Sequence, residues 1–409
     1  MNNRPFKKPA ITFLFSDTGG GHRAAAEAIA EAIYAEYGDT LVTKKVDFFK
    51  DYAPPPFNIL PKLYPQMMKV PELWGAFFDL SDGRSQARFM TSAFWPYVSN
   101  AAHRLAKEHQ EDVLVSVHPV VNSFLLKAMG AQHLPYITVV TDLVSTHAMW
   151  FDRRADLIFV PTEMARRRAL EYAVSPEKVR AVGQPVSTRF SNPSGNKQAL
   201  REKLGWPQDK FIVLLVGGGE GMGPLAGIAH AIDESDLNAT LVIIAGRNAK
   251  LEAELKVVKW GNSTFTYGFV NAMPDFMWAA DFIVTKAGPG TIAEALIAGL
   301  PIILYAKLYG QENGNVDFVE NEKVGVWAPN PAKVVRTLRR WISKPGEREA
   351  VIANCRRAAR PDATRTIAHF LGAYAGSIDL SQKMPGVLPA GAGRTWRPLP
   401  RLRPDVKKT

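Results

Sequence analysis

A histidine follows a run of glycines near the start of the chain, in the stretch ITFLFSDTGGGHRAAAE at residues 11–27. The apolar residues before the glycines predict a buried strand and the alanine-rich residues after them predict a helix, so His22 falls where the helix begins. The positive end of a helix disfavours an imidazolium and lowers the pKa of such a histidine. A neutral imidazole beside the bare Gly20–Gly21 backbone is suited to accept a proton, which makes His22 a candidate catalytic base. A histidine that only hydrogen-bonds the loop is the structural alternative.

The same loop also fits another chemistry. Gly19, Gly21 and Ala24 match the G-x-G-x-x-A form of the dinucleotide fingerprint. Asp47 ends the next predicted strand, about where that fingerprint has its ribose-binding acid. An NAD-dependent oxidoreductase is therefore a competing interpretation.

Two further glycine-rich loops follow predicted strands in the second half, LLVGGGEGMGP (214–224) and VTKAGPGTIAEAL (284–296). Backbone N–H groups at a helix start favour an anion, so both loops are candidate phosphate sites. We expect Glu294 to lie in the first turn of the second helix and to bind ribose hydroxyls. The residues of these two turns are Gly217, Gly218, Gly219, Gly221, Met222, Gly223, Gly288, Pro289, Gly290 and Thr291.

A cluster of polar side chains follows another predicted strand in YGQENGNVDF, made of Gln311, Glu312, Asn313 and Asn315. This composition is typical of a site that binds sugar hydroxyls, and together with the glycine loops it favours a nucleotide sugar. The sequence contains no Walker A motif and no Asp-x-Asp pair, so neither P-loop phosphoryl transfer nor a metal-bound diphosphate is indicated. We expect Lys286, Arg247 and the helix ends to neutralise the diphosphate instead.

Alternating strand-like and helical stretches predict the elements that must position these residues. Short apolar strands separated by helices indicate a doubly wound α/β fold with parallel sheets. The pattern breaks at residues 183–198, which are rich in Pro, Ser, Asn and Gly and predict a linker. We therefore expect an N-terminal domain at 1–185, a C-terminal domain at 199–376 and a basic, proline-rich tail at 377–409. The expected strands are Ile11–Ser16, Leu41–Val46, Val113–Val117, Tyr136–Thr141, Leu157–Val160, Phe211–Val216, Thr240–Ala245, Thr264–Tyr267, Phe282–Thr285 and Pro301–Leu304.

Composition and charge narrow the class of protein. A single cysteine, Cys355, excludes an internal disulfide and is typical of reducing cytosol. The longest apolar run, Leu296–Ala306, is too short to cross a bilayer. A net charge of +11 favours anionic partners, and a membrane-surface or polyanion-binding protein without catalysis is a third interpretation. Nucleic acid is not favoured, because the basic residues follow no recognisable binding fold.

Two segments are candidates for contact with a membrane. Residues 52–97 are dense in proline and large aromatic side chains, which favour the lipid interface when they are exposed. The basic tail 394–409 is suited to an anionic leaflet, and a purely solubilising role is its alternative. The aromatic residues in question are Trp74, Phe77, Phe78, Phe94 and Trp95.

Several motifs resemble those of the monogalactosyldiacylglycerol synthases, a glycosyltransferase group related to diacylglycerol glucosyltransferases and to the muramyl-pentapeptide N-acetylglucosaminyltransferase. They are SDTGGGHRAAAEAI, SVHP, VVTDLVSTHAMWF, GGGEGMGP, AGRN, TKAGPGTIAEALIAGLPIIL and GQENGNV, in order from about residue 10 to 375. The resemblance implies a GT-B fold, in which two facing Rossmann-like domains enclose the active site. It also implies inverting, metal-independent transfer of a hexose from a UDP-sugar to diacylglycerol, by a peripheral protein on the cytosolic face of a membrane, with no cofactor.

The resemblance also implies roles for individual residues. The C-terminal loops would bind UDP, with Gly219, Gly221, Gly223 and Arg247 at the diphosphate, the backbone at Phe269–Val270 at uracil and Glu294 at the ribose. Gln311 and Glu312 would face the hexose. On the N-terminal side, the His22 loop and Asp142 would flank the acceptor hydroxyl, with His22 as base and Asp142 as the alternative base.

Some alternatives stay open at this point. GGGEGMGP and KAGPGTIAEAL resemble the galactolipid branch of the group more than the peptidoglycan branch, so galactose is the favoured sugar. UDP-glucose remains the alternative donor, because the two sugars differ at one hydroxyl group that Gln311 and Glu312 could bind in either orientation. His118 and His147 are further candidates for the base, and a structural role is favoured for each.

Overall fold

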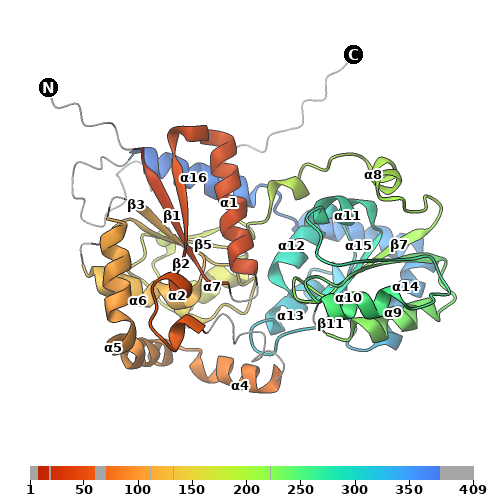
Figure 1. Ribbon diagram of the computed structural model, residues 1–409, viewed down its shortest axis with the longest axis horizontal. Helices are drawn as coiled ribbons and strands as arrows, with labels where there is room; N and C mark the ends of the chain where they lie inside the picture. The colour runs from red at the N-terminus through yellow and green to blue at the C-terminus, as the bar shows by residue number, and fades with distance from the viewer. Residues whose placement is uncertain are drawn as a thin grey trace, which may run out of the picture.

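The computed structural model describes residues 8–17, 20–59, 71–110, 112–131, 133–221 and 223–377. Gly19, Met222 and the basic tail from residue 378 onward, all singled out above, lie outside these residues. Two α/β domains lie side by side, each built on a parallel sheet of six strands (Figure 1). The expected α/β architecture of two Rossmann-like domains is confirmed.

The first sheet has the order β2-β1-β3-β4-β5-β6. Its strands are β1 (Ala10–Phe15), β2 (Val42–Asp47), β3 (Asp112–Ser116), β4 (Tyr136–Val139), β5 (Leu157–Val160) and β6 (Val179–Ala181). Its helices are α1 (Gly21–Tyr37), α2 (Phe48–Asp51), α4 (Pro71–Ser81), α5 (Arg84–Glu108), α6 (Pro119–Met129) and α7 (Glu163–Glu171). Short 3-10 turns are η1 (Gly38–Thr40), η2 (Phe57–Ile59), η3 (Ala148–Trp150), η4 (Pro176–Lys178) and η5 (Thr188–Phe190).

The second sheet has the order β12-β11-β10-β7-β8-β9. Its strands are β7 (Phe211–Val216), β8 (Ala239–Ile244), β9 (Thr264–Tyr267), β10 (Phe282–Lys286), β11 (Ile302–Ala306) and β12 (Gly325–Trp327). The helices from the linker onward are α8 (Lys197–Leu204), α9 (Leu225–Asp233), α10 (Ala249–Lys256), α11 (Met273–Ala279), α12 (Pro289–Ala298), α13 (Asn313–Asn321), α14 (Pro331–Ser343), α15 (Pro345–Ala358) and α16 (Ala363–Ser377).

The strand orders fix where a ligand site can form. In an open α/β sheet the crevice lies at the carboxyl ends of the strands, where the direction of winding reverses. That point lies between β1 and β3 in the first sheet and between β7 and β10 in the second. The loops that follow these four strands include the glycine-rich loops of the sequence analysis.

The strands form because their apolar residues are buried on both faces of each sheet. Every residue of β1 and of β8 is buried, which matches the continuous apolar runs expected of central parallel strands. Helices cover both faces, so each sheet separates two apolar clusters of the core. The edge strands β6 and β12, each three residues long, were missed by the sequence analysis.

The chain crosses between the domains twice, and both crossings are packed. The segment expected to be a linker buries Val186 and Phe190 in the core of the second domain. Helix α16 ends the segment 199–376 that we expected to form the C-terminal domain, yet it packs beside α1 on the first domain (Figure 1). The hydroxyl of Thr364, in α16, donates to the carbonyl oxygen of Val186 over 2.6 Å and ties the two crossings together.

The described part of the aromatic-rich segment forms η2, α4 and the first half of α5, and α4 and α5 lie along the lower edge of the molecule in Figure 1. Phe77 and Phe94 are exposed, Trp74 and Trp95 are half-buried, and Phe78 is buried. Across the described part of the chain, no helix combines the length and the apolar character needed to span a bilayer.

Candidate active site

The first winding reversal brings the side chains of His118 and Thr141 next to His22. Gly20 has a φ of +76°, a left-handed conformation that glycine adopts without strain, and helix α1 begins at the next residue. The His22 ring lies 4.7 Å from the His118 ring, centroid to centroid, because His118 follows the neighbouring strand β3. Nδ1 of His22 lies 2.9 Å from Oγ1 of Thr141, which follows β4. The base candidate is therefore held by residues from three adjacent strand ends.

Burial sets the charge of His22. Loss of solvent around the ring lowers the pKa of His22 to about 4, and a backbone hydrogen bond at Val117 opposes this shift only in part. The direction agrees with the expectation, while its cause is burial rather than the helix end. At neutral pH the ring is uncharged and retains a lone pair, which a general base requires. Burial also holds the pKa of His118 well below its usual value.

Asp142 connects the two domains. Its Oδ2 accepts a hydrogen bond of 2.6 Å from the indole N–H of Trp150, and its Oδ1 accepts one of 3.2 Å from the side-chain amide of Gln311. Trp150 belongs to the first domain and Gln311 to the second. Burial raises the pKa of Asp142 to about 6, and the two hydrogen bonds oppose that rise. The carboxylate that we expected at the acceptor and the amide that we expected at the hexose are thus in direct contact.

Lys286, at the end of β10, lies between the two glycine loops at the second winding reversal. Its side chain passes beside the loop after β7: its Cε is 3.2 Å from the position that a Cβ on Gly218 would occupy. Its Nζ forms an ion pair of 2.8 Å with Oε1 of Glu312 and lies 3.5 Å from the Cβ position of Gly288. A cation therefore lies between the two glycine loops where an anionic diphosphate was expected.

Glu312 has a different position from the one expected. Its residue is 3% exposed. One carboxylate oxygen pairs with Lys286, and the other accepts a hydrogen bond of 2.8 Å from the backbone N–H of Leu308. Both oxygens are occupied by protein groups, so in this structure Glu312 orients Lys286 and does not face an open site.

Helix α12 presents an uncapped N-terminus at the same crevice. Gly288 is its N-cap residue, without a side-chain cap, and Pro289 is its first residue. A Cβ on Gly290 would meet no atom within 4 Å. The first N–H groups of a helix lack partners within the helix and favour an anion.

Glu294 lies one turn further along α12 than expected, because the helix begins at Pro289 and its first turn contains no acidic residue. The residue is half-buried, and none of the other described residues hydrogen-bonds or pairs with its carboxyl group. Burial raises the pKa of Glu294 to about 7. A half-buried carboxyl group without a protein partner is suited to accept hydrogen bonds from a ligand.

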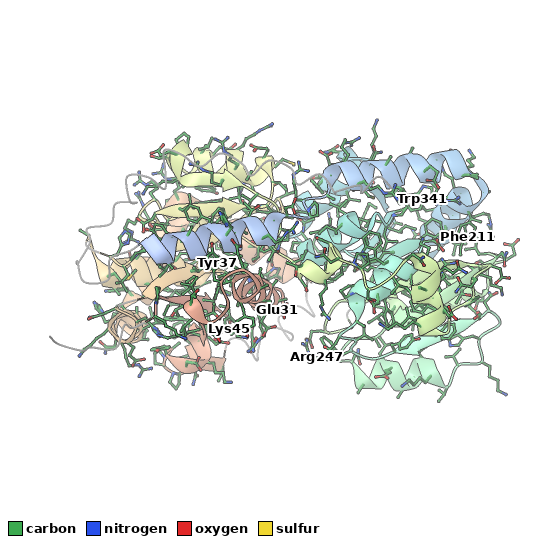
Figure 2. All side chains as sticks on the ribbon, turned by 90° about the horizontal axis from the view of Figure 1, so that it is seen from above. Glu31, Tyr37, Lys45, Phe211, Arg247 and Trp341 are labelled. Carbon is green, nitrogen blue, oxygen red and sulfur yellow. The ribbon has the colours of Figure 1, made fainter. Side chains whose placement is uncertain are left out.

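Arg247 lies on the side of the second domain that faces the first (Figure 2). Its guanidinium group lies 4.5 Å from the ring centroid of the exposed Phe269 and pairs with Glu220 over 2.8 Å. Its Nη1 is 3.1 Å from the Cβ position of Gly219, so these two expected diphosphate residues are adjacent. The pKa of Asp17, in the first domain, is lowered by the hydrogen bond from Arg23 and, more weakly, by the charge of Arg247.

Two glycines of the loop after β7, Gly221 and Gly223, are packed closely against other parts of the second domain. A Cβ on Gly221 would lie 2.1 Å from the carbonyl oxygen of Ala245, and one on Gly223 would lie 2.8 Å from the ring of Tyr305. Both have a positive φ. These two positions therefore require glycine before any ligand is considered. Val270 is half-buried beside Phe269.

Three amide oxygens of the polar cluster 311–315 have no partner. Oε1 of Gln311, Oδ1 of Asn313 and Oδ1 of Asn315 are buried, and no described residue donates a hydrogen bond to any of them. An unsatisfied buried acceptor is costly, and a site that binds hydroxyl groups is one setting where it is expected.

The NAD interpretation is not supported by the position of Asp47. Its Oδ1 accepts hydrogen bonds from the backbone N–H groups of Phe49 and Lys50, and its Oδ2 accepts one from that of Asp17. Asp47 caps α2 and is 4% exposed, so its carboxylate is occupied and does not face a ribose. In the described part of the chain, no cluster of three or more His, Cys, Asp or Glu side chains is arranged to hold a metal ion.

The other two histidine candidates have structural surroundings. His147 accepts a hydrogen bond of 3.2 Å from the backbone N–H of Met149 and caps the turn η3. His118 packs against Phe49 and His22. Thr141, which contacts His22, was missed by the sequence analysis; its place beside Asp142 at the end of a strand was the available signal.

Comparison with known proteins agrees with this geometry. Residues 212–355 match the family model described as the glycosyltransferase family 28 C-terminal domain, and residues 22–186 match that described as monogalactosyldiacylglycerol (MGDG) synthase. MurG of Acinetobacter baumannii has the same architecture, with a TM-score of 0.58 at 15% identity over 89% of this chain and 99% of MurG. The fold and the C-terminal domain define a glycosyltransferase of the GT-B class.

Sequence relatives identify the family. A probable monogalactosyldiacylglycerol synthase of Glycine max is 37% identical over 89% of this chain and 71% of its own length. The monogalactosyldiacylglycerol synthase of Spinacia oleracea is 35% identical over 90% of this chain and 73% of its own length. This chain belongs to the monogalactosyldiacylglycerol synthase family, as its motifs led us to expect.

Proposed function

We propose that this glycosyltransferase moves galactose from UDP-galactose to the free hydroxyl of diacylglycerol, with inversion at the anomeric carbon. The observation that carries the proposal is the contact between Asp142 and Gln311, which joins the acceptor side of the cleft to the donor side. The names of the family and of its curated relatives support the choice of galactose and diacylglycerol. UDP-glucose, the alternative donor, is not favoured by them.

In this proposal the second domain binds UDP. The diphosphate lies between the glycine loops, where Lys286, Arg247 and the open N-terminus of α12 are arranged to neutralise it without a metal. Glu294 accepts hydrogen bonds from the ribose, and uracil lies at Phe269–Val270. Support comes from the lone carboxyl of Glu294 and from the exposed ring of Phe269.

The hexose lies between Gln311, Asn313 and the first domain. The unpartnered amide oxygens of Gln311 and Asn313 are acceptors for sugar hydroxyl groups. Glu312 acts through Lys286 and does not contact the sugar, which changes the role that the resemblance implied for it.

Transfer is a single displacement. The acceptor oxygen attacks the anomeric carbon from the face opposite UDP, the bond from that carbon to the phosphate oxygen breaks, and UDP leaves with the electron pair. A base removes the hydroxyl proton. His22 is uncharged at neutral pH and stands at the acceptor side, and a bound diphosphate raises the pKa of a nearby imidazole towards the working pH. Asp142, with a pKa of about 6, is the alternative base.

The surface made by α4 and α5 is the proposed membrane contact. Phe77, Leu80 and Phe89 are 49%, 78% and 73% exposed, and Arg84 and Arg88 are exposed beside them. Apolar side chains flanked by cations suit an anionic bilayer surface. We expected the cytosolic face of the membrane, but the curated relatives are named chloroplastic, which does not favour that side. The proposal is therefore peripheral attachment to a membrane surface.

One experiment tests the reaction. The protein is incubated with diacylglycerol vesicles and either UDP-galactose or UDP-glucose, without divalent cations and with chelator. We expect a β-linked monogalactosyl lipid and free UDP. Glucosyl lipid as the main product, or no glycolipid from either donor, would refute the proposal.

A further inference from the structure

A loop of the first domain, residues 142–145, is inserted into the second domain. It follows β4, a central strand of the first sheet. Leu143 is nevertheless buried in the core cluster of the second domain, and Val144 packs against the same cluster. Residues 142–145 therefore connect the two domains through side chains, in addition to the two crossings of the backbone.

The backbone of this loop is anchored in its own domain. The hydroxyl of Thr162, which caps α7, donates to the carbonyl oxygen of Leu143 over 2.8 Å. The guanidinium Nε of Arg168 donates to the carbonyl oxygen of Thr146 over 2.6 Å. The backbone of the loop is therefore fixed to the first domain, while its side chains contact the second.

Those side chains contact the start of α13. The backbone N–H of Gly314 donates to Oγ of Ser145 over 2.8 Å. The N-cap residue of α13, Glu312, forms no capping hydrogen bond, because its carboxylate is occupied by Lys286 and by the N–H of Leu308. A side chain of the other domain therefore caps this helix, satisfying an N–H group that would otherwise lack a partner.

The loop also fixes Gln311, which lies two residues before the start of α13. Asp142 accepts a hydrogen bond from the amide of Gln311, so contacts with residues 142 and 145 hold Gln311 and Gly314 on either side of Asn313. Glu312, in contrast, is held inside its own domain. Docking of the loop sets the positions of Gln311 and Asn313 but not the position of Lys286.

We propose that Ser145 is a positioning residue for the donor hexose: it caps α13 from the opposite domain and aligns Gln311 and Asn313 on the sugar. This inference rests on the proposed function. The sugar subsite is complete only when residues 142–145 are docked, whereas the UDP subsite is built by the second domain alone. Binding of the sugar and binding of UDP are therefore separable.

The test compares Ser145→Ala with Ser343→Ala, which removes an exposed hydroxyl at the far end of α14. In Ser145→Ala we expect KM for UDP-galactose to rise about fivefold, the factor that loss of one capping hydrogen bond carries. Calorimetry should find the Kd of UDP unchanged within twofold. Ser343→Ala should match the wild type in both measurements.

Gly314→Ala tests the same contact from the other side, because its Cβ would lie 2.7 Å from Cγ1 of Val144 and push the loop away. It should raise KM for UDP-galactose at constant UDP affinity, whatever the folding yield of Ser145→Ala. Unchanged KM in both variants, or a parallel rise in KM and in the Kd of UDP, would overturn the inference. Failure of the wild type to bind UDP would instead overturn the proposed function, and this inference with it.

Discussion

Replacing Glu294 with glutamine should stabilise the free protein and weaken UDP binding. The Glu294 carboxyl group is half-buried and has no partner among the described residues, and burial raises its pKa from 4.5 to about 7. The folded protein therefore binds a proton on Glu294 that the unfolded chain releases at a lower pH. Ionising this group in the folded state costs free energy, which a neutral amide of similar shape does not incur.

The gain in folding free energy from Glu294→Gln follows from the pKa shift of Glu294 and depends on pH. The full shift corresponds to about 3 kcal/mol, and since Glu294 is only half-buried we expect about half of that. The pKa of Glu294 is higher in the folded protein than in the unfolded chain. The wild type therefore keeps its full folding stability below pH 4.5 and loses part of it as the pH rises through 7. Glu294→Gln should therefore match the wild type near pH 4.5 and melt about 3 °C higher at pH 8.

The same substitution removes the charge that a ribose would contact. Hydrogen bonds to a charged acceptor contribute roughly 1.5–3 kcal/mol, so the Kd of UDP at pH 8 should rise about tenfold to a hundredfold. Melting curves across this pH range and calorimetry with UDP measure both effects, and Glu254→Gln on the exposed face of α10 is the matched control. The reasoning fails if the difference in Tm does not grow with pH, or if UDP affinity falls no more than in the control.

Four further outcomes are expected. His22→Ala should lower kcat by about 10²–10⁴ with the Kd of UDP unchanged, measured at saturating donor; near-normal turnover would exclude His22 as the base. If Asp142 is the base, kcat/KM should fall tenfold per pH unit below about 6 and this limb should vanish in Asp142→Asn, whereas a limb near pH 4 in the pH–rate profile would assign the role to His22. Lys286→Met should weaken UDP binding by at least tenfold in calorimetry, since it removes the cation between the glycine loops and leaves the buried Glu312 carboxylate without its partner; unchanged affinity would place the diphosphate elsewhere. Phe77→Ser combined with Leu80→Ser should lower binding to anionic vesicles in a sedimentation assay at unchanged UDP affinity, and equal vesicle binding would show that α4 does not face the membrane.

The sequence predicted the central strands well because each carries its own signal. A parallel strand buried on both faces is mostly apolar, as in Phe211–Val216 of β7, Leu241–Ile244 of β8 and Phe282–Val284 of β10. The edge strands β6 and β12 were missed, since three residues give no periodicity and their pairing depends on a neighbouring strand. Glu294 was expected in the first turn of α12 and lies in the second, because the helix already begins at Pro289.

The polar cluster shows where sequence reasoning reaches its limit. Gln311, Glu312 and Asn313 look equivalent in the sequence, yet the structure buries Glu312 against Lys286 and leaves amide oxygens of the other two without partners. Nothing local distinguishes them, because the difference depends on β10, which brings Lys286 to the start of α13.

The sequence by itself determined the strand-loop-helix units and placed glycine, histidine and carboxylate residues at their junctions, since backbone conformation and burial pattern are local properties. Only the tertiary structure decided which of these groups meet. Burial lowers the pKa of His22, and the contacts of Asp142 with Gln311 and of Ser145 with Gly314 form between residues far apart in the chain. These features arise from sheet order and from the docking of one domain on the other, which are fixed by the packing of the whole molecule.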